Sequence, residues 1–465
     1  MELGSQRLVR FFNAAVPVAV ALVLSIASHG RPSAWAGGFG GQRGGAVGGV
    51  MIDGEGVVRN ASTEELADYA NRIRAILDDP SGDLNEASEL RVVSLRGLQD
   101  AIRESREKGQ PIPDEASLLA GLQRIEYVFV DQERRDILIA GPAEPWELRQ
   151  DGSIVGTVSG RTTLRLDDLA VAIQSVQSAR DGGITCSIEP TPEGRRNLQK
   201  MLARIVIRQG QNPSHLVPAM REAFGPQQVK LSGVPGESRM ARTLVAADFE
   251  MKRLAMGLVD SPVRGLPSYL EMSKNSRHSG AQNPRWWMAC DYDELKRSDD
   301  GLAWRITGQG VKALTDNDLI DAQGNASAAG RIDKVAQRWA KLLTNEYNDL
   351  AKSMPVFADL RNTMDLNVVA TLIVQEQLAE KAGLDLTILS ADKDTMNMGS
   401  YFVPEQIPAH CSFIQGAGGW IVTASGGVDI NAFEVVQRQA TDESVADART
   451  EALASADQNR WWWNQ

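Results

Sequence analysis

The densest group of potential acid–base residues lies in the stretch CDYDEL, which places Asp291, Asp293 and Glu294 almost next to one another. A carboxylate cluster could serve glycoside hydrolysis or calcium binding. Glycosidase carboxylates, however, face each other across the scissile bond, and the EF-hand spacing is missing here. We therefore expect a solvated strand end. The alternative is a hydrolase in which these carboxylates work with His278 or His410.

Histidine and cysteine also allow few arrangements. His410 and Cys411 are adjacent, so on a strand they point to opposite faces, and a catalytic dyad would need a partner such as His278 or His215. No ligand pair has the spacing of a structural zinc site. Cys186, Cys290 and Cys411 lie far apart, and spacing does not decide between one disulfide and three buried thiols. We predict no cofactor and no metal.

Tryptophan is clustered: five of the ten tryptophans are Trp286, Trp287, Trp461, Trp462 and Trp463. Exposed aromatic side chains can stack on sugars or anchor a protein partner. For the first pair we favour the core, with a ligand or partner face as the alternative. Three consecutive residues cannot share one face of a helix or strand. We therefore expect the terminal run to dock in a groove of its own core; the alternatives are a partner or second copy, and a sugar or membrane surface.

The stretch TASGGVDI places Gly426 and Gly427 after Ser425, which could suggest a phosphate loop or a nucleophile. A phosphate loop needs a helix after the glycines, whereas the residues from Val428 onward alternate as in a strand. We predict a hairpin turn at the two glycines.

The first 36 residues have the three parts of a secretory signal peptide. Arg7 and Arg10 precede an apolar run over residues 11–27, and Ala34-Trp35-Ala36 is a small-x-small cleavage motif. The alternative is an uncleaved anchor. We expect cleavage and an exported chain, periplasmic or secreted, with no stable membrane span.

The charge balance disfavours nucleic acid as a partner. The chain has 49 basic and 60 acidic residues, a net charge of −11. Nucleic-acid affinity rests on lysine and arginine displacing counterions.

The pattern of elements predicts an α+β fold: mixed sheets with packed helices, an N-terminal helical layer and a long central helical hairpin. Residues 125–143 are expected to form a β-hairpin, and RWWMACDYD to pair with the strand that follows. Ser62, Asp167 and Thr191 are expected helix N-caps. The helix around LNVVATLIV is apolar all round and should be buried on every side. The predicted regions are a signal peptide (1–36), a Gly-rich linker (37–57), a helical region (58–120), an α/β domain (121–260), an α+β domain (261–440) with its hairpin at 328–382, and an amphipathic helix with the Trp-rich tail (441–465).

Several stretches together resemble a known family, among them RIEYVFVDQERRDILIAGPAEPW, ITCSIEPTPEG, ARTLVAADFEMKRLAMGL and GWIVTASGGVDI. They are similar to an uncharacterised family of exported bacterial proteins catalogued as a domain of unknown function, over roughly residues 120–440. The resemblance implies a bacterial, exported protein with one continuous core. It implies no activity, cofactor or catalytic residue.

From the sequence, our leading hypothesis is a non-catalytic exported protein that binds or scaffolds in the cell envelope or outside the cell. The alternative is an envelope hydrolase acting on saccharide or peptide through Asp291, Asp293 or Glu294 with a histidine. The two hypotheses differ in whether those carboxylate and histidine side chains converge in a cleft. Substrate class, oligomeric state and disulfide pairing stay open.

Overall fold

The structure is a computed structural model. It describes residues 46–47, 50–52, 58–206, 213–273, 283–320, 326–328, 333–391, 396, 399–409, 413–416, 419–422, 425–457 and 460–465. The predicted signal peptide, most of the predicted linker, His278, His410 and Cys411 lie outside these residues.

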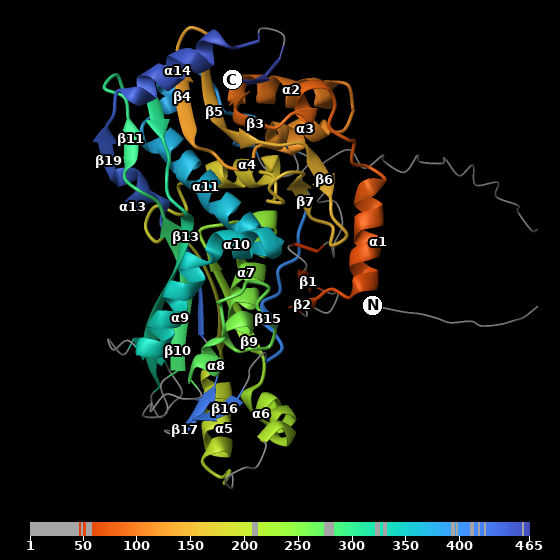
Figure 1. Cartoon of the computed structure of the whole chain (residues 1–465), viewed down its shortest axis with the longest axis vertical. Helices are drawn as coiled ribbons and strands as arrows, with labels where there is room; N and C mark the ends of the chain where they lie inside the picture. Colours follow the sequence, from red (N-terminus) through yellow and green to blue (C-terminus); the bar gives the residue numbers. More distant parts are fainter. Residues whose placement is uncertain are drawn as a thin grey trace, which may run out of the picture. The chain divides into compact units, whose positions relative to one another are not determined.

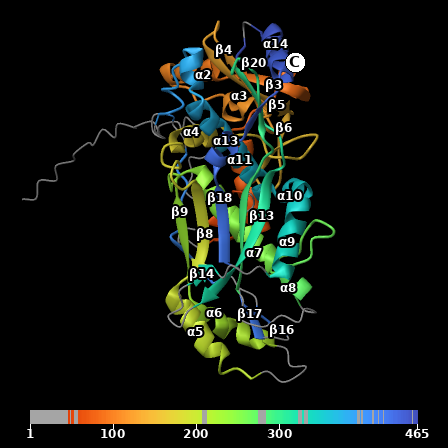
Figure 2. The same cartoon turned by 90° about the vertical axis from the view of Figure 1, so that its left-hand side faces the viewer.

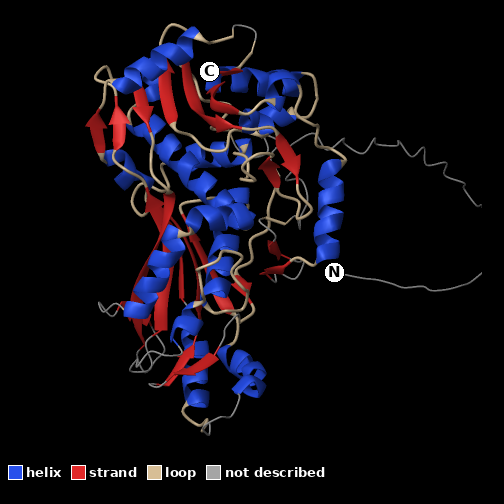
Figure 3. Ribbon diagram, in the orientation of Figure 1, coloured by secondary structure: helices blue, strands red, loops and turns tan. Residues whose placement is uncertain are grey.

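Two seven-stranded mixed sheets and the helices around them make an α+β fold, as predicted (Figures 1 and 3). We call the first the β10 sheet. Its strand order is β14 (Ala326–Ala328), β13 (Gly310–Ile320), β10 (Asn283–Asp291), β18 (Ser425–Ile430), β8 (Ile184–Pro190), β9 (Gln227–Ser232) and β15 (Gln406–Ile407). Only β10 and β18 pair in parallel among these strands.

We call the second the β5 sheet. Its order is β19 (Gln439–Thr441), β11 (Leu295–Arg297), β12 (Ala303–Arg305), β4 (Tyr127–Asp131), β5 (Asp136–Ala143), β3 (Ser88–Ser94) and β20 (Trp462–Asn464). The β4–β5 hairpin was predicted from its alternating apolar residues. Both sheets take strands from either side of residue 260, so segments distant in the chain build each of them. The predicted domain boundaries stay predictions.

One helix lies at the centre of the packing. α11 (Pro355–Gln375) contacts α4 (Leu166–Ser175), α7 (Arg239–Ala255) and α13 (Ala432–Gln437), and its residues from Pro355 to Ile373 are all buried. The predicted burial of this helix on every side is therefore confirmed. α7 also packs on β8 and β18, whereas α9 (Lys334–Asn345) packs on β13. Residues 328–382, predicted as a helical hairpin, thus contain α9 and α11, and these two helices pack mainly on different elements.

The other elements are shorter or peripheral. The helices are α1 (Thr63–Arg74), α2 (Leu95–Glu107), α3 (Asp114–Ser117), α5 (Pro192–Leu202), α6 (Val217–Phe224), α8 (Tyr269–Ser273), α10 (Tyr347–Ser353), α12 (Leu378–Ala382) and α14 (Ser444–Ala454). Three two-stranded pairs are β1 (Val50–Ile52) with β2 (Val58–Asn60), β6 (Trp146–Leu148) with β7 (Ile154–Gly156), and β16 (Phe413–Gly416) with β17 (Gly419–Val422).

Local capping signals were right at two of three helices. The Ser62 side chain accepts from the backbone of Glu65 in a capping box, and Thr191 accepts from the backbone of Gly194. The prediction for Asp167 was wrong: Arg165 is the N-cap of α4, and Asp167 lies in the first turn. An acidic residue there still interacts favourably with the helix dipole.

The predicted turn at Gly426 and Gly427 was also wrong, because both lie inside strand β18. A Cβ atom at Gly426 would overlap the carbonyl oxygen of Trp286, and one at Gly427 would overlap that of Cys186. The glycines are needed for close approach to both neighbouring strands, β10 and β8, rather than for a change of direction.

Candidate functional site

Three charged side chains from three helices form a buried ion-pair cluster in the interior. Arg239, the first residue of α7, contacts Asp168 of α4 through one guanidinium nitrogen and Asp359 of α11 through the other, the latter at 2.7 Å. The exposed fractions of these side chains are 10%, 1% and 6%. Three helices that meet in the core therefore each place a charge at one point.

Burial changes the acid–base behaviour of this cluster. It raises the pKa of Asp168 to about 7, and the attraction of Arg239 offsets the effect only in part. The two carboxylates also hold the pKa of Arg239 well above its usual range, although burial acts in the opposite direction. Burial therefore makes the Asp168 carboxyl hold its proton more tightly than an exposed aspartate does.

A cavity opens beside Arg239. Its walls come from α1, the β6–β7 hairpin and the segment after it, α7 and α11, and they include Tyr69, Thr163 and Tyr401. Buried Ala46 and Val47 close it from the N-terminal side. Gly152 packs so closely on the Tyr69 ring that no Cβ would fit. Two residues of the predicted linker, Ala46 and Val47, are thus part of the cavity wall.

Arg242 lies one helical turn beyond Arg239 on the same face of α7. It is 1% exposed, and none of its three guanidinium nitrogens has a hydrogen-bond partner among the described residues. Burial lowers the pKa of Arg242, and the nearest groups that act against this are Tyr401 and Tyr69 of the cavity wall. A buried guanidinium without an acceptor is rare and costly, because arginine stays charged in proteins.

Two other buried polar groups have their partners. Asp365 of α11 accepts two bonds from Arg124, at 2.8 and 2.9 Å, and one from the Tyr292 hydroxyl at 2.6 Å. On α7, Lys252 pairs with Asp248 at 2.8 Å and also donates to the carbonyl of Gly426. These groups tie helices to each other and to the β10 sheet, and we assign them to the core.

The carboxylates predicted as the hydrolase alternative lie at the surface end of β10. Asp293 and Glu294 are exposed and Asp291 is half-buried. Asp291 lies 3.7 Å from Lys312, and Glu294 lies 3.5 Å from Lys296. Asp291 and Glu294 therefore each have a lysine neighbour. The two predicted histidine partners, His278 and His410, lie outside the described residues.

The predicted pair of tryptophans is divided between the two faces of the β10 sheet. Trp286 is completely buried against α8 and α9, with edge contacts to Tyr269 and Trp339. Trp287 points to the opposite face and is half-buried. Its neighbours across the strands are Leu314 and Gly427. The prediction of a core role therefore fits Trp286, and Trp287 stays a candidate contact residue.

We call the face of the β10 sheet opposite α7 and α9 the open face; Figure 2 looks onto this sheet. Apart from Trp287, Leu314 and Ala289, its described side chains are polar or absent. They are Arg285, Lys312, Asp316, Ser425, Gly427, Asp429, Thr185, Ser187, Glu189, Gln228, Lys230 and Ser232.

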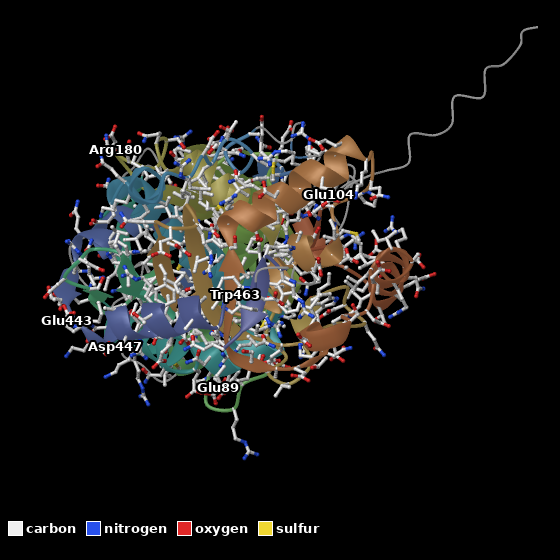
Figure 4. All side chains as sticks on the ribbon, turned by 90° about the horizontal axis from the view of Figure 1, so that it is seen from above. Glu89, Glu104, Arg180, Glu443, Asp447 and Trp463 are labelled. Atoms are coloured by element: carbon white, nitrogen blue, oxygen red, sulfur yellow. The ribbon has the colours of Figure 1, made fainter. Side chains whose placement is uncertain are left out.

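The terminal tryptophans dock on the chain itself, as predicted. β20 pairs with β3, which places Trp462 and Trp463 on opposite faces of the β5 sheet. The Trp463 indole donates to the carbonyl of Ala452 in α14 at 3.0 Å. In Figure 4, which looks onto this end from above, Trp463 is labelled near the middle of the view and the acidic residues Glu443 and Asp447 toward one side. Trp461 is half-buried.

On the opposite face of the β5 sheet, the Trp462 ring stacks with Arg91, whose guanidinium carbon lies 5.3 Å from the ring centroid. The terminal segment is therefore held by contacts on both faces of the β5 sheet.

Within the described residues, no group of histidine, cysteine and carboxylate side chains is arranged to hold a metal. Cys186 and Cys290 are both free thiols. The described helices also include none that is both long enough and apolar enough to cross a membrane.

Sequence reasoning missed the cluster at Arg239. The available signals were two arginines at a spacing of three in RMARTL and two aspartates at the start of α4. Charged residues at core-facing helical positions need partners, but the pattern does not say which partners they have.

Comparison with known proteins places one part of the chain. Neither curated proteins nor solved structures gave a match. Residues 186–269 match the family model described as "Protein of unknown function (DUF1598)". The matched segment runs from β8 through α7 into α8, and so it contains both Arg239 and Arg242.

Proposed function

We propose that the protein is exported and binds a saccharide chain at the open face of the β10 sheet, without catalysing a reaction. The observation that carries the proposal is the position of Trp287, half-buried on a flat sheet face that α7 and α9 leave uncovered. Export rests on the leader pattern of the first 36 residues.

Saccharide fits this face because sugar rings offer one apolar side and many hydroxyl groups. The Trp287 ring provides an apolar surface, and Leu314 extends it on one side. On the other side stands Gly427, so no side chain obstructs a ring beside the indole. Ser187, the next residue in the row, can exchange hydrogen bonds with hydroxyl groups.

Two charged side chains beside Trp287 and Ser187 on the open face, Arg285 and Glu189, already form an ion pair. Arg285 donates to Glu189 at 3.2 Å, and this ion pair crosses over the small side chain of Ser425 in the strand between them. A neutral ligand therefore requires no separation of the pair. Paired charges with intervening hydroxyl groups favour an uncharged, hydroxyl-rich ligand over a highly charged one.

A protein partner fits less well. Stable protein interfaces bury roughly 1,200–2,000 Å² and have an apolar centre. Among the described residues of the open face, only Trp287 and Leu314 are large and apolar. That is enough to stack one or two sugar rings.

The test is a pelleting assay with two insoluble polysaccharides, purified peptidoglycan and cellulose. We expect the protein to sediment with at least one of them, and Trp287→Ala to lower its affinity at least about tenfold, the loss of one well-stacked aromatic contact. The matched control is Trp461→Ala, which changes a half-buried tryptophan away from this face. Failure of the unaltered protein to sediment with either polymer would exclude the proposal, as would equal binding by Trp287→Ala.

Export has a separate test. The N-terminal residue of protein purified from the producing cells should be Gly37, directly after the Ala34-Trp35-Ala36 motif. Recovery of material that begins at Met1 would exclude cleavage.

A further inference from the structure

One carboxylate on the open face of the β10 sheet receives no hydrogen bond from any described residue. Asp429 follows Gly427 by two positions in β18, so both belong to the same face. Its side chain is half-buried. Burial raises the pKa of Asp429, the carboxylate of Glu434 acts in the same direction, and no hydrogen-bond donor of the described chain offsets them. Glu189, another carboxylate of this face, has such a donor in Arg285.

Asp429 and Trp287 lie at opposite corners of a square of four residues on β10 and β18. Trp287 is the partner of Gly427, and Ala289 is the partner of Asp429. Diagonal neighbours in a sheet lie roughly 7–8 Å apart. The other two corners carry only a hydrogen atom and a methyl group, which are too small to separate the indole from the carboxylate. One sugar ring that stacks on the indole therefore has its edge within reach of Asp429.

The chemistry of a carboxylate decides which ring edge fits. An ionised carboxylate only accepts hydrogen bonds, and it has two oxygens to do so. Two neighbouring hydroxyl groups of one sugar ring can donate to both oxygens at once, and bonds to an ionised acceptor are stronger than bonds between neutral groups. Thr185, the partner of Asp429 on β8, adds a hydroxyl group at the same edge. This corner therefore complements a ring with an apolar face and two adjacent hydroxyl groups.

The charge around Asp429 disfavours an acidic ligand. The exposed Glu434 of α13 places a second negative charge near it. Lys312 of the neighbouring strand β13 lies 3.7 Å from Asp291, so this cation already has a carboxylate beside it. A sugar that carries a carboxylate would bring a third negative charge to the corner, and unfavourable contacts of this kind discriminate between ligands. A neutral sugar meets no such repulsion.

We propose that Asp429 is the specificity-determining residue of the open face, where it accepts hydrogen bonds from two neighbouring hydroxyl groups of the sugar ring stacked on Trp287. The ligand is then a neutral polysaccharide of unmodified hexoses, for which cellulose is the probe. Peptidoglycan fits less well, because its sugars are N-acetylated and its peptides carry carboxylates. This inference rests on the proposed saccharide binding and narrows its substrate class.

The first experiment compares the affinities of the unaltered protein for cellulose and for peptidoglycan in the pelleting assay. We expect the affinity for cellulose to be at least about tenfold higher, the factor that one hydrogen bond to an ionised group supplies. Equal affinities, or binding to peptidoglycan alone, would overturn this inference and leave the proposed saccharide binding intact. Binding to neither polymer would exclude both.

The second experiment changes the carboxylate. Asp429→Asn keeps the size of the side chain but removes its charge and replaces one acceptor oxygen by a donor. We expect the affinity for cellulose to fall about tenfold or more. The midpoint of thermal unfolding should not fall, because no donor of the described chain loses a partner. A purely structural role would lower the midpoint instead. Unchanged affinity in Asp429→Asn would overturn the inference.

The matched control is Glu434→Gln, which removes an exposed negative charge of α13 and leaves the side chains of the open face as they are. Its affinity for cellulose should equal that of the unaltered protein. An equal loss in Glu434→Gln and Asp429→Asn would show an effect of charge alone and would overturn the assignment of Asp429 as a hydrogen-bonding residue.

If Asp429→Asn does not fold, the ligand is changed instead. Cellohexaose and cellohexaose methylated at its hydroxyl groups are compared as competitors that release the unaltered protein from cellulose. Methyl ethers accept hydrogen bonds but cannot donate them, so the methylated competitor should be at least about tenfold weaker. Equal competition by the two compounds would overturn the inference.

Discussion

Two of the completely buried arginines lie in different parts of the molecule, and their surroundings are opposite. Arg91 of β3 is 0% exposed, and each of its guanidinium nitrogens donates a hydrogen bond. Arg242 of α7 is 1% exposed, and none of its nitrogens does so among the described residues. The same side chain, equally buried, is therefore fully bonded in one region and unbonded in the other.

The partners of Arg91 come from the chain itself. It donates to the carbonyls of Ala120 at 2.7 Å and Glu86 at 2.8 Å, and to the Asn464 side chain at 2.7 Å. The Trp462 ring covers its face. Burial lowers the pKa of Arg91 to about 10, and these neutral partners nevertheless keep the charge solvated. A buried arginine built for stability is thus surrounded by its own acceptors.

The contrast suggests different roles for the two regions. The end of the molecule with β3 and β20 is closed by the terminal tryptophans and has the properties of a completed core. Around Arg242, in contrast, the described residues offer no acceptor, so this buried charge is not compensated as that of Arg91 is. Predictions that separate these roles follow from the difference.

Removing residues 460–465 should have the largest effect. It deletes β20, exposes the surfaces that Trp462 and Trp463 cover, and takes Asn464 from Arg91. We expect the free energy of unfolding to fall by about 4–6 kcal/mol, since each buried tryptophan contributes about 3–5 kcal/mol and the freed tail regains entropy. Chemical denaturation measures the change. The smaller change Trp463→Phe keeps the fold measurable, and a loss below about 1 kcal/mol on truncation would contradict a docked tail.

Arg91→Met should have the next largest effect. It leaves the buried carbonyl of Ala120 without a donor, at a cost of about 1–3 kcal/mol, and removes a partly buried hydrogen bond to the carbonyl of Glu86. Arg242→Met leaves no acceptor of the described residues without a donor, so it should change stability by less than about 1 kcal/mol or raise it. Equal losses in the two variants would remove the distinction between the regions.

Protonation of Asp168 should give a smaller, pH-dependent effect. Its pKa is about 7 in the folded protein and 3.8 when unperturbed. The folded state therefore holds the proton more tightly, and the stability that this group contributes is fully present below pH 3.8 and is lost as the pH rises through about 7. Asp168→Asn should flatten the decline in unfolding free energy over this window. The control is the exposed Asp181→Asn, and an unaltered pH profile in Asp168→Asn would contradict the raised pKa.

Much of the fold could be predicted because its signals are local. The alternating residues of β4 and β5 indicated their hairpin, and the apolar residues all round α11 indicated its burial. Docking of the tail followed from a similar argument, because adjacent tryptophans cannot share a face of a strand. The structure places Trp462 and Trp463 on the two faces of the β5 sheet.

The cluster around Arg239 could not be predicted, because its parts are distant in the chain. Asp168 lies 71 residues before Arg239, and Asp359 lies 120 residues after it. The two glycines of β18 show the same limit: their local chemistry is that of a turn, and only the backbones of β10 and β8 explain why they lie in a strand. Pairings between distant segments decide both features.

The most direct test compares the two arginines in one experiment. The unfolding free energies of Arg91→Met, Arg242→Met and the unaltered protein are measured by chemical denaturation in one buffer. We predict a loss of at least about 1 kcal/mol for Arg91→Met, which leaves the buried Ala120 carbonyl without its donor, and a change of less than about 1 kcal/mol, or a gain, for Arg242→Met. An equal loss of stability in the two variants would contradict the difference between the two regions.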